Sequence, residues 1–165
     1  MSVEIVRGDM FASGARGLVN PVNGIGVSGK GLARVFKQRC PDAVAEYERQ
    51  ARHTTLRPGE VMAVWSPASA KANGGVARLI YFAPTKVHWR DPSTVDGVAL
   101  TLLDLARRIM GNGPGTHESV AVPALGCGCG GLAWDDVRPR MLAILGEVRG
   151  VRVLIYEPHE TPPAW

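Results

Sequence analysis

The sequence predicts a single α/β domain, a sandwich of helices around a largely parallel sheet. Segments patterned like strands alternate with segments patterned like helices along the whole chain. The length of 165 residues suits one domain with a sizeable core and is short for two. Because no linker or internal repeat divides the chain, we expect one domain over residues 1–165, with an extended tail from about residue 157.

The composition excludes several classes of protein. Hydrophobic residues at 45% and charged residues at 21% are typical of a globular chain and argue against disorder. The sequence contains no run of about 18 apolar residues, so we expect no membrane-spanning helix. The N-terminus lacks the layout of a signal peptide. Three cysteines do not form a disulfide framework, so we expect a reducing, cytoplasmic setting. A net charge of +4 permits a phosphate-bearing ligand without arguing for one.

The first third of the chain contains two expected strands and two expected helices. Val3–Arg7 alternates apolar and polar residues before a glycine, and Gly17–Pro21 is a short apolar run. Leu32–Lys37 has a helical pattern. A second helix begins at Pro41, with Asp42 as its expected N-cap, and continues to about residue 52.

The middle third contains two expected strands followed by a long helix. Glu60–Ser66 alternates, and Arg78–Thr85 is strongly apolar, while the small polar residues of Ala68–Gly75 between them predict a surface loop. Ser93 with Asp96 three residues later resembles a capping box, which predicts a helix from there to about residue 110.

The last third contains a strand, a helix and a final strand. Ser119–Pro123 follows an expected loop over Gly111–His117. Trp134–Glu147 is the expected last helix and Val151–Tyr156 the last strand.

Two glycine-rich segments each follow a strand and precede a helix. They are Asn20–Gly31 and Leu125–Leu132. Glycine lets backbone N–H groups approach a phosphate, and a helix N-terminus favours an anion. Neither segment has the spacing of a Walker A motif or a Rossmann fingerprint. On spacing alone, a ligand with more than one phosphate and a pair of purely structural turns stand about equal.

Four sequence blocks together resemble the macrodomain family. They are Gly8–Phe11; Leu18–Asn23 with Ser28–Ala33; Pro84–Lys86 with His88–Ser93; and Pro123–Gly128 with Gly130–Trp134. The resemblance implies a three-layer α/β/α fold with a central mixed, largely parallel sheet and a site for ADP-ribose. It is closest to the branch that contains the DarG antitoxins and the terminal ADP-ribose protein glycohydrolase, whose members are hydrolases that remove single ADP-ribose units.

The resemblance implies a set of ADP-ribose contacts. Asp9 would accept a hydrogen bond from the adenine amino group, although an aspartate after a glycine is also a common turn residue. The glycine-rich segments would hold the diphosphate through their backbone. The implied binding residues are Gly8, Asp9, Met10, Asn20, Ser28, Gly29, Lys30, Gly31, Thr85, Leu125, Gly126, Cys127, Gly128, Cys129, Gly130 and Gly131.

The resemblance also implies two catalytic residues, Lys86 and Asn23. Lys86 either attacks the anomeric carbon as a neutral amine or polarises the distal ribose, and both roles remain open. Asn23 would orient that ribose. The protein glycohydrolase has a catalytic aspartate where this chain has Gly130, which favours the DNA-directed type of enzyme.

Neither a metal nor a cofactor is expected. Cys127 and Cys129 with the distant Cys40 lack the spacing of zinc ligands and are expected to be free thiols.

His88, Trp89 and Arg90 are candidate DNA contacts, because aromatic stacking and arginine are the usual means of holding single-stranded DNA. The alternative places Trp89 in the core and pairs Arg90 with Asp91.

The leading hypothesis is an ADP-ribosyl glycohydrolase that removes mono-ADP-ribose from thymidine in DNA and so reverses a DarT-type modification. This is a DNA-repair role within a toxin–antitoxin system. A hydrolase acting on ADP-ribosylated Glu or Asp side chains of proteins, and a non-catalytic ADP-ribose reader, are the alternatives.

The expected partners are ADP-ribose and ADP-ribosylated single-stranded DNA, or else ADP-ribosylated protein, with no membrane. The given sequence ends at Trp165, so a toxin partner is possible but has no support from a C-terminal interaction domain in this chain. Whether the sequence is part of a longer antitoxin or a stand-alone enzyme stays open, and a monomer is expected.

Overall fold

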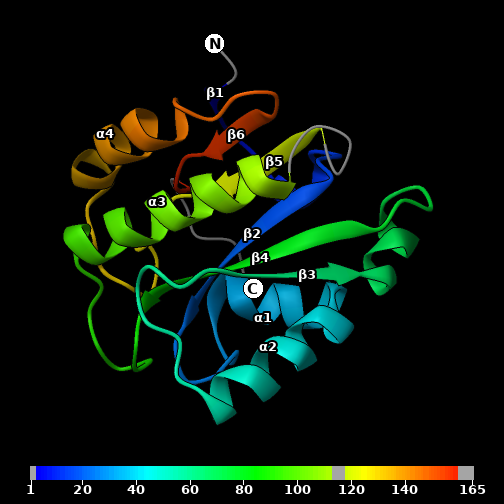
Figure 1. Cartoon of the computed structure of the whole chain (residues 1–165), viewed down its shortest axis with the longest axis horizontal. Coiled ribbons are helices and arrows are strands. Elements are labelled where there is room, and N and C mark those ends of the chain that lie inside the picture. Colours follow the sequence, from blue (N-terminus) through cyan, green and yellow to red (C-terminus); the bar gives the residue numbers. More distant parts are fainter. Residues whose placement is uncertain (1–2, 113–117, 160–165) are drawn as a thin grey trace.

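A six-stranded sheet lies between two layers of helices, which confirms the three-layer α/β/α fold (Figure 1). The computed structural model describes residues 3–112 and 118–159. The strands are β1 Val3–Val6, β2 Gly17–Asn23, β3 Met62–Ser66, β4 Arg78–Lys86, β5 Ser119–Pro123 and β6 Arg152–Tyr156. The α-helices are α1 Gly31–Arg39, α2 Pro41–His53, α3 Val95–Asn112 and α4 Trp134–Leu145, and the 3-10 helices are η1 Met10–Ala12 and η2 Pro67–Ala72.

The order of the strands decides where the loops meet. The sheet runs β1-β6-β5-β2-β4-β3, and all neighbours are parallel except the edge strand β3, which is antiparallel to β4. The central strands β5, β2 and β4 therefore end at one edge of the sheet. Ligands of open α/β sheets bind at that carboxyl edge, so the topology places the glycine-rich segments where a ligand site is expected.

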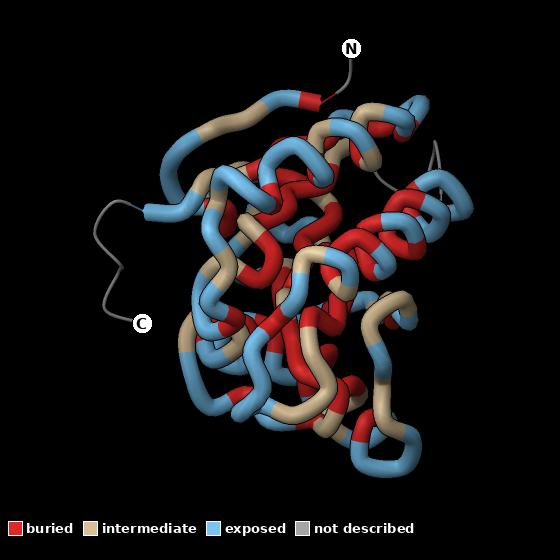
Figure 2. The backbone as a smooth tube through the Cα atoms, turned by 90° about the vertical axis from the view of Figure 1, so that its left-hand side faces the viewer, coloured by how far each residue is buried: buried red, intermediate tan, exposed pale blue. Residues whose placement is uncertain are grey.

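Both faces of the sheet are buried, which explains the continuous apolar pattern of β4. Ile80 and Phe82 point toward α1 and α2, while Leu79 and Tyr81 point toward α3 and α4. Figure 2 shows these buried stretches running through the middle of the molecule between exposed outer segments. Each helical layer thus has its own apolar core.

Two expected helix starts are wrong. The N-cap of α2 is Cys40, and the Asp42 carboxylate instead accepts hydrogen bonds from Ser66 Oγ (2.6 Å) and the backbone N–H of Ala68 (3.0 Å) as well as from its neighbour Ala43 (2.9 Å). Helix α3 begins one residue later than the expected capping box, because Thr94 Oγ1 accepts from the Gly97 N–H at 3.0 Å. In the first case, tertiary contacts with the end of β3 overrode the local pattern, whereas in the second a neighbouring threonine took over the capping position.

Other boundaries also differ from the sequence pattern. Strand β2 continues through Asn23 because it keeps pairing with β4, so the expected loop begins four residues later. The surface loop expected over residues 68–75 contains the 3-10 helix η2. Residues 113–117 of the expected loop, and residues 160–165 of the expected tail, lie outside the described residues. In the described part of the chain, no helix is long and apolar enough to cross a membrane.

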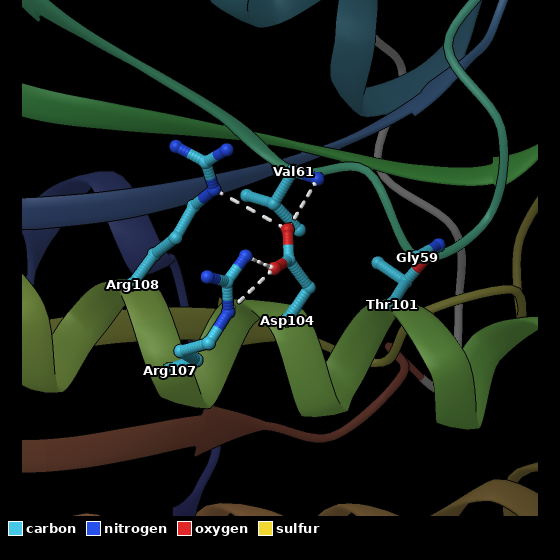
Figure 3. Close-up of polar contacts among 6 residues, drawn as sticks. All are labelled: Gly59, Val61, Thr101, Asp104, Arg107 and Arg108. Atoms are coloured by element: carbon cyan, nitrogen blue, oxygen red, sulfur yellow. Dashed lines mark hydrogen bonds and ion pairs between the residues drawn. The ribbon is translucent and has the colours of Figure 1, made fainter.

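Asp104 connects α3 to the edge of the sheet (Figure 3). Its Oδ2 accepts the backbone N–H of Val61 at 2.8 Å, and its carboxylate also pairs with the guanidinium groups of Arg107 and Arg108. Burial alone would raise the pKa of Asp104, but these hydrogen bonds outweigh it and hold the pKa below its ordinary value. The carboxylate is therefore ionised and stabilising at neutral pH.

We expect Asp104→Asn to lower the free energy of unfolding by about 2 kcal/mol at pH 7, because charge-assisted hydrogen bonds to a nearly buried carboxylate are lost. The wild-type pKa is depressed in the folded state, so its advantage is full above the unfolded value of about 4 and fades as the pH falls through the folded pKa. Denaturant unfolding at pH 7 and at lower pH measures this difference. Asp96→Asn is the control, since that side chain is exposed and lies 3.9 Å from Arg140; an equal loss in both variants would contradict the assignment.

Candidate active site

The two residues expected to be catalytic lie side by side at the carboxyl edge. Asn23 ends β2 and Lys86 ends β4, and the two are directly paired in the parallel ladder after a small irregularity at residue 22. The next backbone group continues the contact, because the Gly24 N–H donates to Val87 O at 2.8 Å. Strand pairing therefore fixes the separation of these two side chains.

Asn23 shapes the first glycine loop, which we define as residues 24–30. Its Oδ1 accepts the N–H groups of Ile25 and Val27, both at 3.2 Å, and its Nδ2 donates to Val27 O at 2.8 Å. The buried Tyr47 hydroxyl donates to Asn23 O at 2.6 Å, and burial raises the pKa of Tyr47, which keeps this donor protonated. With 7% of its surface exposed, Asn23 acts mainly as a support for the loop.

Lys86 connects the strand end to the second glycine loop, which we define as residues 124–133. The half-buried side chain reaches across the site, and its Nζ donates to the backbone carbonyl of Cys129 at 3.1 Å. This contact positions the amine between the two loops. The amine thus lies where it can act on a ligand that the loops hold.

Gly130 leaves no room for a carboxylate in the second loop. A Cβ at this position would lie 2.3 Å from Ser93 Oγ and 2.6 Å from Gly126 O. The Ser93 N–H donates to Gly130 O at 3.0 Å, which holds the loop against the start of α3. The absence of an acidic side chain here is therefore built into the packing. Ser93, which the sequence indicated only as a helix start, is a supporting residue of the site.

The two glycine loops meet beside the start of α1. A Cβ on Gly31 would lie 3.5 Å from Cys129 Sγ, so α1 begins against the second loop. The N-cap residue Lys30 makes no side-chain cap, and the first turn of α1 has no acidic residue. Its free N–H groups and helix dipole suit an anion such as a diphosphate.

The other expected ligand residues fall into exposed and buried groups. Asp9 is exposed, and its Oδ1 accepts the Phe11 N–H at 2.9 Å as the N-cap of η1, so one oxygen serves the turn. Asn20 and Leu125 are fully buried, and their expected ligand contact stays a prediction. The other buried members of the set are Met10, Ser28, Thr85, Gly126 and Gly130. The exposed members are Gly8, Gly29, Lys30, Gly128, Cys129 and Gly131, and the half-buried ones are Gly31 and Cys127.

The His88–Arg90 segment forms a stack on the surface. Trp89 is 43% exposed, the His88 ring is stacked beside its ring at 5.5 Å between centroids, and the Arg90 guanidinium lies 4.7 Å from the ring centre. The alternative that buried Trp89 in the core is therefore wrong. The exposed Trp89, three residues from Lys86, can contact a group that projects from the site.

The three cysteines are free thiols. Burial raises the pKa of Cys127 to about 11 and also raises the pKa of buried Cys40, so neither is activated as a thiolate. Within residues 3–112 and 118–159, no three His, Cys, Asp or Glu side chains gather as metal ligands do.

Sequence reasoning missed Tyr47 and the tight contact of Gly24. Tyr47 resembled any other apolar-face residue of α2, and only the fold brings its hydroxyl to Asn23. A Cβ on Gly24 would lie 1.8 Å from Leu56 O, and the Gly24 carbonyl accepts the Leu56 N–H at 2.9 Å. The sequence shows that a glycine stands at position 24, but it does not show that Leu56 is the residue that packs against it.

Each glycine loop provides a matched pair of variants. We expect Gly24→Ala and Gly130→Ala to lower the free energy of unfolding by about 1–3 kcal/mol, because the added methyl group meets backbone atoms that cannot yield. Gly29→Ala and Gly128→Ala have open space at the Cβ and are expected to stay within about 0.5 kcal/mol of wild type. Denaturant unfolding distinguishes the two classes; equal effects within either pair would contradict the packing described above.

Comparison with known proteins identifies the family. The family model described as "Macro domain" matches residues 19–141. The chain is 36% identical over 162 residues to a protein of Thermus aquaticus named DNA ADP-ribosyl glycohydrolase, covering 98% of this chain and 43% of that protein. A Mycobacterium tuberculosis protein of the same name is 37% identical over 151 residues, 92% of this chain and 41% of that protein. The chain thus spans less than half the length of these relatives.

Solved structures agree with the sequence comparison. The macrodomain of Mycobacterium tuberculosis DarG superposes with a TM-score of 0.84 at 34% identity, covering 95% of this chain and 98% of that one. Thermosipho africanus DarTG in complex with ADP-ribose gives a TM-score of 0.85 at 33% identity, covering 97% of this chain and 42% of that one. The chain belongs to the macrodomain family.

Proposed function

We propose that this macrodomain is an ADP-ribosyl glycohydrolase that removes mono-ADP-ribose from thymidine in DNA. The observation that carries the proposal is Lys86, held at the carboxyl edge between the two glycine loops and beside Asn23. Relatives that match over nearly the whole chain are named DNA ADP-ribosyl glycohydrolases, which supplies the substrate class.

The proposed ligand is ADP-ribose, held as follows. The free N–H groups at the start of α1 and the backbone of the second glycine loop bind the diphosphate. The exposed oxygen of Asp9 receives the adenine amino group, and the second amide hydrogen of Asn23, which has no acceptor among the described residues, is available to the distal ribose. A related structure, Thermosipho africanus DarTG, contains ADP-ribose.

Hydrolysis breaks the bond between the anomeric carbon and the base nitrogen. Water supplies the hydroxyl group to that carbon and a proton to the departing thymidine, which leaves free ADP-ribose and repaired DNA. Lys86 either polarises the distal ribose while charge develops or first attacks the carbon itself as a neutral amine. No step uses a carboxylate at position 130, which agrees with the lack of space there.

The His88–Arg90 stack is the proposed contact for the modified base or its neighbour. One relative is named a fusion of a DNA ADP-ribosyl transferase with a DNA ADP-ribosyl glycohydrolase, so we place the reaction in the reversal of DarT-type modification. The free thiols agree with a cytoplasmic enzyme.

The second candidate is a hydrolase acting on ADP-ribosylated Glu or Asp side chains of proteins. It presents the same ADP-ribosyl group to the site, but the packing of Gly130 against Ser93 weighs against a carboxylate-assisted mechanism. A non-catalytic reader would need the glycine loops without needing Lys86.

The test compares two substrates, an oligonucleotide ADP-ribosylated on thymidine and a protein ADP-ribosylated on glutamate. We expect release from the oligonucleotide and a loss of at least about 10²-fold in Lys86→Ala, because a group acting at the reacting carbon is removed. Lys71→Ala is the matched control, since that lysine is exposed and lies on η2.

The other outcomes each select a different function. Release from protein alone would favour the second candidate. No release from either substrate, with ADP-ribose still bound in calorimetry, would leave a reader. Mass spectrometry of the wild type during turnover separates the two roles of Lys86, because only attack by the amine adds ADP-ribose to the enzyme.

A further inference from the structure

A basic hollow lies between the C-terminal half of α3 and the edge strand β3, away from the carboxyl edge. It is lined by Ala63, Arg107, Arg108 and Gly111. The site described above uses none of these residues. We name the surface made by Ala63, Trp65, Arg107 and Arg108 the basic groove.

Asp104 holds the two arginines of the groove in place (Figure 3). It receives two N–H groups of Arg107 and the Nε of Arg108, at 3.3 Å, while its remaining contact goes to the Val61 backbone. Two guanidinium groups share one carboxylate, which leaves the cluster net positive. Their side chains are 74% and 41% exposed, so N–H groups remain to bind an anion, and guanidinium matches phosphate geometry.

Trp65 adds an aromatic surface to the groove. It is two residues from Ala63 on the same strand and therefore lies on the same face of the sheet. The residue is 41% exposed, and the Arg16 guanidinium lies 5.8 Å from the centre of its ring. Positive charge beside exposed aromatic rings is typical of surfaces that hold single-stranded nucleic acid.

The groove is connected to the strand that carries Lys86. The Thr101 hydroxyl of α3 donates to Pro84 O at 2.6 Å, two residues before Lys86, and accepts the Gly59 N–H at 2.9 Å. Arg108 lies seven residues further along α3, a rise of about 10 Å. Adding about 7 Å for the last two residues of β4 places the arginines about 17 Å from Lys86. That span equals about five stacked nucleotides.

We propose that the basic groove binds the phosphate backbone, and Trp65 a base, of the single-stranded DNA that carries the ADP-ribosyl group. This inference rests on the proposed function for its substrate class. The strand leaves the ribose site past the His88–Arg90 stack and follows the edge of β3. The enzyme therefore recognises a length of DNA and not only the modified nucleotide.

The first experiment measures binding of an unmodified 12-nucleotide single strand by fluorescence anisotropy over a range of salt concentrations. We expect Arg107→Gln with Arg108→Gln to weaken affinity about tenfold near 0.1 M salt. The slope of log affinity against log salt should fall by about 1.4, because two phosphate contacts on a single strand are lost. Trp65→Ala should weaken binding with little change of slope.

Two controls keep this result interpretable. Arg52→Gln with Arg138→Gln removes the same charge from exposed positions on α2 and α4 and is expected to change affinity less than twofold. Arg107→Lys with Arg108→Lys keeps the charge and should retain most of the salt slope. The rise in melting temperature with ADP-ribose checks that each variant still folds. Wild-type DNA affinity in the Gln double variant, or an equal loss in the Arg52/Arg138 control, would overturn the inference.

The second experiment separates the groove from the proposed chemistry. Hydrolysis is compared for a single ADP-ribosylated thymidine nucleotide and for the same nucleotide within a 12-nucleotide strand. We expect the ratio of kcat/KM for the strand to kcat/KM for the nucleotide to fall about tenfold in the Gln double variant. An unchanged ratio would contradict the groove. If neither substrate is hydrolysed by wild type, the proposed function fails, while the binding experiment still tests the groove by itself.

Discussion

The parallel pairing of β2 with β4 is the constraint on which the rest of the site depends. It brings Asn23 and Lys86, 63 positions apart in the chain, to neighbouring places in one ladder. Because the two strand ends are fixed, the loops that follow them also start from fixed, neighbouring positions. The amine of Lys86 then reaches the second glycine loop through a single hydrogen bond to a backbone carbonyl. Strand geometry thus places the chemistry, and side-chain contacts refine it.

Close backbone contacts hold the two loops in shape. Gly24 lies against the Leu56 carbonyl and Gly130 lies against Ser93, in spaces too small for any side chain. These glycines let each loop be fastened to a neighbouring segment while its other N–H groups stay free for a ligand. The same packing removes any carboxylate from position 130, so the proposed reaction relies on the amine of Lys86 and on backbone groups. Loop packing and reaction type are therefore linked.

Helix α3 has a second group of polar contacts, on the side that faces β3. Thr101 contacts the strand that ends in Lys86, and Asp104 fixes both Val61 and the two arginines at the far end (Figure 3). One helix face thus connects the contact with β4 at Thr101 to a basic surface about 10 Å further along. The cluster of Asp104, Arg107 and Arg108 thus both stabilises the fold and forms the proposed anion-binding surface.

The sequence by itself determined the α/β class and the order of the strands and helices, because apolar periodicity and glycine-rich turns are local signals. The residues expected at the centre of the site, Asn23 and Lys86, were implied by the resemblance of the sequence motifs to the macrodomain family, and their roles stay a prediction. The strand expected over Arg78–Thr85 is present and continues one residue further, to Lys86. Only the tertiary structure decided that Asp42 contacts the end of β3 rather than capping its helix, that Asn20 and Leu125 are fully buried, and that Tyr47 and Ser93 hold the glycine loops. These roles depend on partners that are distant in the sequence. A hydrogen bond between two such residues produces no periodic pattern of residue types, so it cannot be predicted from the sequence.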